Sequence, residues 1–359
     1  MQRALTLAAR GMETTTPNPR VGCVLVRDGQ MVGEGWHERA GEPHAEVYAL
    51  RAAGFAAQGS TAYVTLEPCS HTGRTGPCCE ALAAAGVARV VVAMQDPNPL
   101  VAGRGIAYLL AAGLTVSVGE QEAAARTLNA GFISRMTRGR PWVRMKVGMS
   151  LDGRTALANG RSQWITGPEA RADVHRQRAR ACAVLTGLGT LHADDPELTV
   201  RAVATTRQPL RVLVDARLGA AAGSRLFSGG NTVVLTAAPR LSLRFVETLE
   251  AQGIRVLGVP VQPGEPHHLD LRAALEALAR EQVNEVLVEA GASLNGALLA
   301  AGLVDECIFY VAPALLGSGA RGLADFGPLT ELGDRVRLRF TDVATVGPDL
   351  RITAVTDAQ

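Results

Sequence analysis

Residues 43–46 read Pro-His-Ala-Glu, and residues 68–78 read Pro-Cys-Ser-His-Thr-Gly-Arg-Thr-Gly-Pro-Cys. Together they offer one imidazole and two thiols as zinc ligands, His44, Cys69 and Cys78, and one acid, Glu46, that is not needed as a ligand. A structural zinc site is closed by four protein ligands, whereas a catalytic site keeps a position for water. Water bound there has a pKa lowered to about 7. The pattern therefore predicts a hydrolytic Zn²⁺ site in which Glu46 is the catalytic acid and base.

The spacing of His44 and Glu46 requires a particular local structure. Positions two apart do not share a face in the middle of a helix, so the two side chains can approach one ion only in a first turn. Pro43 stands where a helix would begin, since proline is tolerated at a helix start. The run 45–53 then predicts a helix that ends at Gly54.

The two thiols are placed by a strand and a second helix. Residues 62–66 predict a buried strand that leads to Cys69, and residues 78–85 predict a helix. A thiol at a helix N-terminus beside a cation is driven toward the metal-binding thiolate, and Cys78 fits that place. The adjacent Cys79 is an alternative ligand, and ordinary burial of all these residues is a further one. The remaining cysteines lie in apolar runs and are expected in the core: Cys23, Cys182 and Cys307.

An H-x-E motif followed by P-C-x-x-C is the signature of nucleobase deaminases. This chain keeps H-x-E and P-C but has eight residues between Cys69 and Cys78. Two other functions stay open. One is a nucleic-acid base deaminase, which would need a basic, aromatic-lined groove. The other is a noncatalytic zinc scaffold in which Cys79 or His71 completes a closed site.

Composition limits the class of protein. A chain of 359 residues is long for one hydrophobic core and sufficient for two. A net charge of +2 without a basic block argues against a nucleic-acid surface, and no run of about 20 apolar residues predicts a membrane span. Six cysteines, half of them in or beside the metal motif, do not form a disulfide scaffold, so a reducing, cytoplasmic location is expected.

Strand and helix patterns alternate in the first part of the chain. Such alternation predicts an α/β fold with a largely parallel sheet between helices. The strands are expected at 21–27, 31–36, 62–66, 90–93 and 115–118, with Asp28-Gly29 as a hairpin turn, and further helices at 105–112 and 121–135. Gly139-Arg140-Pro141 breaks this pattern, which places the domain boundary between residues 1–139 and 140–359.

A second α/β pattern follows. Its strands are expected at 142–148, 183–187, 210–215, 232–236, 256–259, 285–289 and 306–311, its helices at 168–180, 243–251, 271–281 and 294–301, and a β-rich tail at 336–355. Glycine-rich turns occur at 187–190, 291–296 and 317–319. The second of them follows a strand and opens a helix, a geometry that suits a phosphate, although a plain turn is the alternative. No G-x-G-x-x-G follows the first strand, so a standard dinucleotide fold is not supported.

The chain resembles the bifunctional riboflavin biosynthesis deaminase/reductase family over essentially its whole length. In the first domain the matching stretches are 17–24 (PNPRVGCV), 35–37 (GWH), 40–46 (AGEPHAE), 66–75 (LEPCSHTGRT) and 96–99 (DPNP). In the second they are 146 with 150–154 (K, SLDGR), 162–166 (SQWIT), 190 with 193–196 (T, ADDP), 198–201 (LTVR) and 288–291 (VEAG). The family also accounts for the long spacing between Cys69 and Cys78.

The resemblance implies two activities on two folds. An N-terminal cytidine-deaminase-like three-layer domain would deaminate 2,5-diamino-6-ribosylamino-4(3H)-pyrimidinone 5′-phosphate, a small phosphorylated pyrimidine. A C-terminal dihydrofolate-reductase-like domain would use NADPH to reduce the ribosyl group to ribityl. Glu46 would move the protons of the first reaction. The family also implies a homo-oligomer.

The resemblance further implies the binding residues. In the deaminase domain Asn18, His71 and Arg74 match substrate contacts, although Gly76 stands where the family often has proline. The expected cofactor contacts are Gly148, Trp164, Thr190, Asp194, Ala216, Gly291, Ala292, Ser293, Leu294, Asn295, Gly296 and Ala297. The expected substrate contacts of the reductase are Ser162, Arg178, Leu198, Arg201 and Glu289, together with Lys146, the only lysine of the chain, which would act at the sugar or the phosphate.

Overall fold

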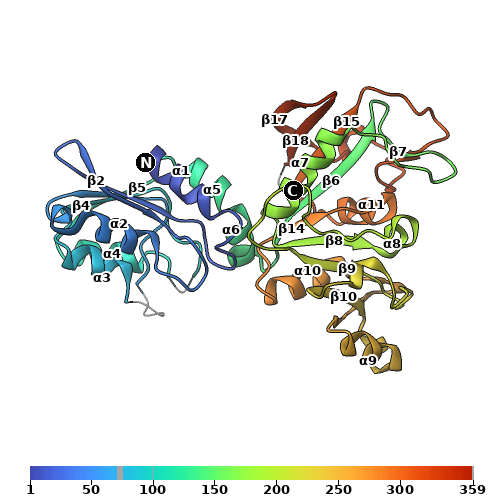
Figure 1. Cartoon of the computed structure of the whole chain (residues 1–359), viewed down its shortest axis with the longest axis horizontal. Coiled ribbons are helices and arrows are strands. Elements are labelled where there is room, and N and C mark those ends of the chain that lie inside the picture. The colour runs from blue at the N-terminus through green and yellow to red at the C-terminus, as the bar shows by residue number, and fades with distance from the viewer. Residues whose placement is uncertain (71–75, 100, 358–359) are drawn as a thin grey trace. The chain divides into compact units, whose positions relative to one another are not determined.

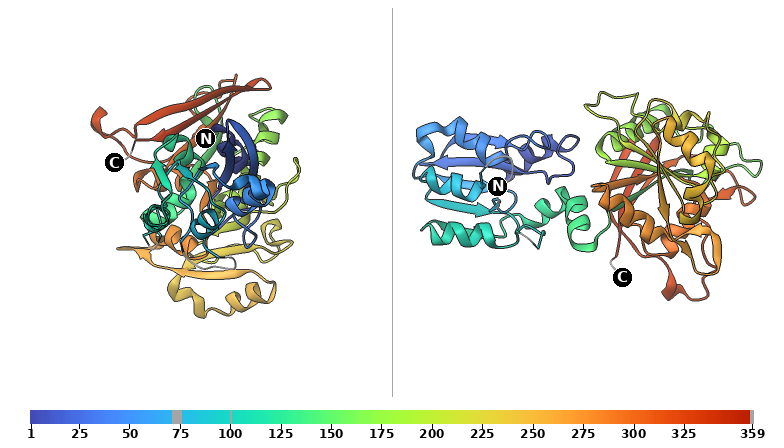
Figure 2. Two further views of the ribbon diagram at one scale, coloured as in Figure 1. Left: turned by 90° about the vertical axis from the view of Figure 1, so that its left-hand side faces the viewer. Right: turned by 90° about the horizontal axis from the view of Figure 1, so that it is seen from below.

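The computed structural model describes residues 1–70, 76–99 and 101–357. The chain divides into two compact units, Met1–Gly139 and Arg140–Gln359 (Figures 1 and 2). Within the described residues, none of the helices has both the length and the apolar character needed to cross a lipid bilayer.

The first unit is built on a mixed sheet of order β2-β1-β3-β4-β5. Strand β1 pairs antiparallel with β2 and β3, whereas β3, β4 and β5 are parallel. The largely parallel sheet expected from the sequence is therefore mixed, because Asp28 and Gly29 both take positive φ and close β1 and β2 into a hairpin. The strands are β1 (Gly22–Arg27), β2 (Gln30–Trp36), β3 (Thr61–Val64), β4 (Arg89–Val92) and β5 (Thr115–Val118).

Helices cover both faces of this sheet. Figure 1 shows α2, α3 and α4 on one face and α1 and α5 on the other. The one closing helix expected over 121–135 is instead two, because Asn129 interrupts it and exchanges two hydrogen bonds with the backbone of Arg20, at 2.8 and 3.0 Å. The helices are α1 (Gln2–Ala8), α2 (Ala45–Ala53), α3 (Cys78–Ala84), α4 (Arg104–Ala111), α5 (Glu122–Leu128) and α6 (Ala130–Arg138), with 3₁₀ turns at Ala9–Gly11 and Gly54–Ala57.

The second unit contains a longer sheet of order β11-β10-β9-β8-β14-β6-β15-β18-β17. Pairing is parallel from β11 to β15, and β18 is antiparallel to both of its neighbours. The strands are β6 (Trp142–Ser150), β8 (Ala183–Gly187), β9 (Leu210–Val214), β10 (Thr232–Ala237), β11 (Arg255–Val259), β14 (Glu285–Val288), β15 (Glu306–Ala312), β17 (Leu338–Val346) and β18 (Asp349–Thr356). Two short ribbons were not predicted: β7 (Arg154–Ala156) with β16 (Arg321–Gly322), and β12 (Val261–Gln262) with β13 (Glu265–Leu269).

Apolar cores lie on both faces of the second sheet, one against α10 and α11 and the other against α7 and α9. The helices are α7 (Pro168–Arg180), α8 (Leu188–Asp194), α9 (Arg244–Ala251), α10 (Leu271–Arg280) and α11 (Ala292–Ala300), with 3₁₀ turns at Arg225–Phe227, Ala238–Ser242 and Leu332–Asp334. The turn expected at 187–190 is in fact the start of α8, because Leu191 packs into the core and holds the helix against the sheet. Parallel strands of this kind carry ligand sites beyond their carboxyl ends.

Candidate functional site

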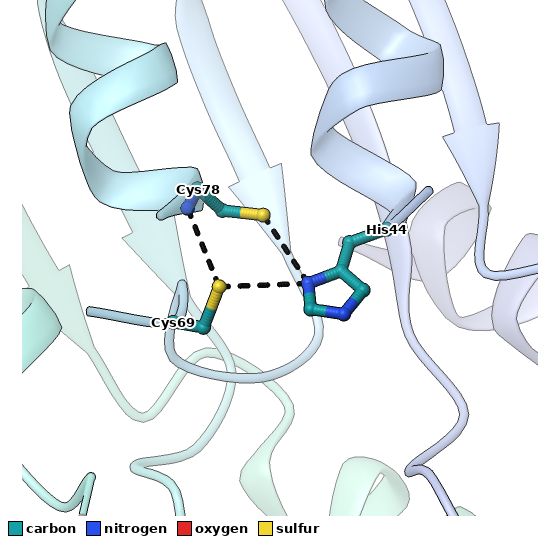
Figure 3. Close-up of side chains that lie close together, drawn as sticks. All are labelled: His44, Cys69 and Cys78. Carbon is teal, nitrogen blue, oxygen red and sulfur yellow. Dashed lines mark hydrogen bonds between the residues drawn. The ribbon is translucent and has the colours of Figure 1, made fainter. Parts of the chain in front are cut away.

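The imidazole and two thiols of the metal motif come together in the first unit (Figure 3). His44 is the N-cap residue of α2 and has an extended backbone, so Pro43 directly precedes the cap of the helix expected over 45–53. His44 Nδ1 lies 3.5 Å from Cys69 Sγ and 3.4 Å from Cys78 Sγ. Zn–S and Zn–N bonds at a tetrahedral angle separate nitrogen from sulfur by about 3.6 Å. The observed donor spacing therefore fits one zinc ion.

The two thiols of this cluster differ in their electrostatics. Cys69 accepts hydrogen bonds from the Cys78 thiol, His44 and the Cys78 backbone N–H, which lower the pKa of Cys69 to about 4 against the effect of burial. The hydrogen bond with Cys69, together with burial, raises the pKa of Cys78. Of the two sulfurs, Cys69 is thus favoured as the thiolate, chiefly because it accepts from the Cys78 thiol, and the N–H at the start of α3 adds to this from 3.3 Å. A metal-bound thiolate at Cys78 stays a prediction.

The alternative ligand Cys79 lies outside the cluster. Its side chain packs among Leu25, Ala49 and Leu82 in the apolar core, and burial raises its pKa to about 11. A backbone hydrogen bond supports this orientation of Cys79 toward the core, because the Cys79 N–H donates to the Cys69 carbonyl at 3.2 Å. The other three cysteines are also buried, as expected.

Glu46 lies in the first turn of α2, next to the cluster. It is 3% exposed, and burial raises its pKa to about 7. Among the described residues, no hydrogen-bond partner contacts its Oε2 atom. With no partner among the described residues, this carboxylate oxygen would be free to accept a hydrogen bond from a water molecule at the three metal donors. The pKa is also close to that of an efficient proton shuttle at neutral pH.

Asn18 reaches the same site through a histidine. Its Nδ2 lies 3.1 Å from Nε2 of His37, whose Nδ1 lies 3.0 Å from the Pro43 carbonyl oxygen. Because a carbonyl only accepts, His37 donates from Nδ1 and accepts from Asn18 at Nε2. The His37 ring also meets the His44 ring edge-on, with centroids 5.3 Å apart. Sequence reasoning gave His37 no role. His71 and Arg74 lie outside the described residues.

Glu67 is a second residue whose role the sequence did not reveal. Its buried carboxylate accepts four backbone N–H groups, those of Asp96, Gly103, Gly105 and Ile106, at 2.9 to 3.3 Å. The close approach of α4 to this loop also requires glycine at position 105, because a Cβ there would lie 2.0 Å from the Pro68 carbonyl oxygen. Glu67 thereby anchors the loop that contains Cys69, and it does so at the start of α4. In the sequence, the position of Glu67 two residues before Cys69 was the feature that could have indicated this supporting role.

The second unit contains a cavity of about 1780 Å³ beyond the carboxyl ends of the parallel strands. All of the residues expected to contact cofactor or substrate in this unit line it, except Asn295. Asn295 is buried, and its amide donates to the carbonyls of Ala290 and Leu323 at 3.3 and 3.0 Å, which ties the turn together. Trp164 is 69% exposed within the cavity wall, and the guanidinium of Arg171 stacks on its ring at 4.4 Å.

Charged side chains gather at one end of this cavity. Glu289 lies directly after β14 and is held by Arg178, at 2.5 and 3.0 Å, and by Lys146, at 3.1 Å. Burial by itself raises the pKa of Glu289, but the two cations outweigh it and hold that pKa well below the ordinary range. The single lysine therefore lines the cavity as one of two partly exposed cations that hold the buried Glu289.

Comparisons with known proteins agree with these two sites. The cytidine and deoxycytidylate deaminase zinc-binding region matches residues 1–94, and the RibD C-terminal domain matches residues 141–352. The Escherichia coli riboflavin biosynthesis protein RibD is 51% identical over 98% of this chain and 96% of that protein. The crystal structure of Acinetobacter baumannii RibD (form 1) is 44% identical with a TM-score of 0.90, covering 99% and 98% of the two chains. A Thermotoga maritima diaminohydroxyphosphoribosylaminopyrimidine deaminase/5-amino-6-(5-phosphoribosylamino)uracil reductase is 30% identical with a TM-score of 0.83, covering 99% and 97%.

Fold and site together define an α/β enzyme with an N-terminal cytidine-deaminase-like domain, which carries a zinc-binding region, and a C-terminal dihydrofolate-reductase-like domain. The chain belongs to the RibD family and is a bifunctional deaminase/reductase of riboflavin biosynthesis. This confirms the family and the fold class expected from the sequence.

Proposed function

We propose that the first unit hydrolytically deaminates 2,5-diamino-6-ribosylamino-4(3H)-pyrimidinone 5′-phosphate, and that the second unit reduces the ribosyl group of the product to ribityl with NADPH. The observation that carries the first half is the buried Oε2 of Glu46, which has no partner among the described residues and lies beside His44, Cys69 and Cys78. The second half is supported by the cavity and by the relative from Thermotoga maritima, whose name states both activities.

In the deaminase site, His44, Cys69 and Cys78 would hold Zn²⁺, which acts as a Lewis acid and makes water nucleophilic at neutral pH. Glu46 accepts a proton from the attacking water and returns it to the departing amine, so one carboxyl group serves both halves of the reaction. Its burial keeps its pKa near 7, which suits both roles. Asn18, oriented by His37, would hydrogen bond to the pyrimidine.

In the reductase site, NADPH would supply the hydride to C1 of the open-chain ribosylamine. The start of α11 presents backbone N–H groups at Ala292 and Ser293 toward the cavity, a geometry that suits cofactor phosphate. Arg178 and Arg201 would bind the substrate phosphate by forked hydrogen bonds. Glu289 keeps Arg178 and Lys146 in place beside the sugar.

A Glu46→Gln variant tests the deaminase. We expect ammonia release from the pyrimidine to fall by about 10²- to 10⁴-fold, the usual contribution of general acid–base catalysis, while bound zinc is retained. Equal rates in wild type and variant would contradict the role of Glu46. NADPH consumption with chemically deaminated substrate is the control and should not change.

A cofactor assay tests the reductase. NADPH should be oxidised only when the deaminated product is supplied, and much more efficiently than NADH. Equal efficiency with NADH would show that the cofactor assignment is wrong. A homo-oligomeric state and a cytoplasmic location also remain proposals, the second supported by six cysteines that form no disulfide.

A further inference from the structure

The segment 198–201 of the second unit has an irregular backbone yet carries two of the expected substrate contacts, Leu198 and Arg201. Leu198 is buried at 2% exposure with a left-handed φ of 54°. No helix or strand hydrogen bonds fix this segment, so its polar backbone groups require other partners. Those partners decide where the Arg201 side chain enters the cavity.

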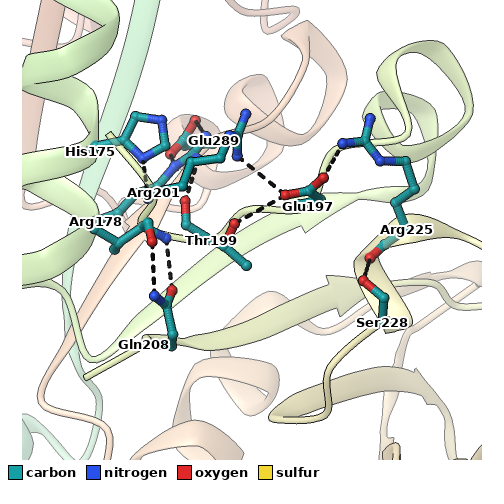
Figure 4. A network of polar contacts seen from close by, with 10 residues as sticks. His175, Arg178, Glu197, Thr199, Arg201, Gln208, Arg225, Ser228 and Glu289 are labelled. Atoms are coloured by element: carbon teal, nitrogen blue, oxygen red, sulfur yellow. Dashed lines mark hydrogen bonds and ion pairs between the residues drawn. The ribbon is translucent and has the colours of Figure 1, made fainter. Parts of the chain in front are cut away.

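Side chains supply these partners at three consecutive residues (Figure 4). The Thr199 carbonyl accepts from Arg178 at 3.0 Å. Both polar groups of Val200 pair with the Gln208 amide at 2.8 Å each. The Arg201 N–H donates to Nδ1 of His175 at 3.2 Å. His175 and Arg178 lie three residues apart on α7, so one helix face holds the segment at Thr199 and at Arg201.

The contact at Arg201 requires one form of the imidazole. Nδ1 can accept only when it carries no proton, so His175 must be neutral with its proton on Nε2. Its surroundings favour the neutral form, because burial and the charges of Arg178 and Arg201 lower the pKa of His175 to about 4, against the opposing effects of Glu289 and of a hydrogen bond with the Thr199 backbone. Two of these charged neighbours are themselves paired: Glu289 with Lys146 at 3.1 Å, and Arg201 with Glu197 at 3.6 Å.

We propose that His175 is a positioning residue of the reductase site: its unprotonated Nδ1 fixes the backbone of Arg201, so that Arg201 meets the phosphate of the pyrimidine substrate together with Arg178. This rests on the proposed function, because it takes the substrate to be phosphorylated. His175 borders the cavity at only 8% exposure, and its acceptor nitrogen is engaged by the Arg201 N–H, so its effect on the substrate passes through Arg201.

Two substitutions separate this role from packing alone. His175→Phe keeps a planar ring but removes the acceptor, and His175→Asn places an acceptor oxygen near the position of Nδ1. In the full-length enzyme, we expect His175→Phe to raise the KM for the phosphorylated substrate about tenfold, the value of one hydrogen bond, with kcat nearly unchanged. His175→Asn should restore most of the affinity. His192→Phe, at an exposed position on α8, is the matched control. Ammonia release by the first unit, measured for each variant, checks that the full-length chain is intact.

Two further readouts decide the proposal. With the dephosphorylated substrate, wild type and His175→Phe should have the same KM, because Arg201 then has no phosphate to meet. Imidazole ¹⁵N NMR of the full-length protein without substrate should show His175, assigned from the His175→Asn spectrum, with the proton on Nε2 at neutral pH.

Equal KM increases in both variants, a loss of kcat alone, a KM penalty that persists without the phosphate, or a proton on Nδ1 would overturn the role of His175. A wild-type enzyme that does not reduce the substrate would instead refute the proposed function. The NMR result would still decide the state of His175.

Discussion

Replacing Glu67 by glutamine should loosen the metal site although Glu67 is not among its three donors. Each carboxylate oxygen accepts two backbone N–H groups: Oε2 accepts from Asp96 and Gly103, and Oε1 from Gly105 and Ile106. Glutamine has one carbonyl oxygen, so its NH₂ group would face two buried N–H donors. A hydrogen bond to a charged group contributes about 1.5–3 kcal/mol, so the loss of two gives a destabilisation of at least about 3 kcal/mol.

That magnitude should be visible in calorimetry and in metal content. For a unit of about this size, 3 kcal/mol corresponds to a decrease of roughly 10 °C in the unfolding temperature. Because the freed loop carries Cys69, zinc affinity should fall about 10- to 100-fold, as for other residues that support metal ligands. Glu120→Gln, at an exposed position of the same unit, is the matched control. A Glu67→Gln enzyme that unfolds at the wild-type temperature and keeps its zinc under a competing chelator would refute this reasoning.

Three further predictions follow from the described contacts. Cys78→Ser should lose bound zinc, whereas Cys79→Ser should keep it at a small cost in stability, because of these two thiols only that of Cys78 lies beside His44. Metal analysis of the two purified variants measures this, and equal losses of zinc would contradict it. Removal of zinc by a chelator should stop ammonia release and leave the NADPH oxidation that depends on the deaminated product intact, since the two sites belong to different units. A parallel loss of both rates would count against separate sites. Glu289→Gln should lower the unfolding temperature at pH 7, because it leaves Arg178 and Lys146 buried without a counter-charge, a situation that costs about 3–5 kcal/mol. The pKa of Glu289 is lowered in the folded protein, so its contribution is complete above the ordinary glutamate pKa of about 4.3 and is lost as the pH falls below it. The unfolding temperature of the variant should therefore change less than that of wild type between pH 5 and pH 3, and parallel curves would contradict this.

Much of the secondary structure followed from local pattern. The helix at 45–53, the helix at 168–180 and the strands at 115–118 and 183–187 were predicted with the bounds that the structure has. The misses have tertiary causes that the local pattern does not contain. Asn129 divides one expected helix by bonding to Arg20, more than a hundred residues away in sequence. Leu191 makes a helix of an expected glycine turn by packing into a core.

The metal motif and its acid were evident in the sequence because their chemistry depends on residue type and short spacing. The supporting residues were not, because Glu67, His37 and His175 act through backbone or ring contacts with residues far along the chain. The sequence favoured Cys78 over Cys79 as the ligand, and the structure adds the reason, since the direction of a side chain at a helix start depends on what packs against it.

The sequence by itself thus determined the family, the α/β class of both domains, and which residue types carry the chemistry, because motifs and apolar periodicity are local properties of the chain. The tertiary structure decided how the two thiols face His44, how burial and neighbouring charges shift the pKa of Glu46 and of Glu289, and how Arg201 is held. These depend on burial and on hydrogen bonds between distant segments, which exist only after the sheets have formed.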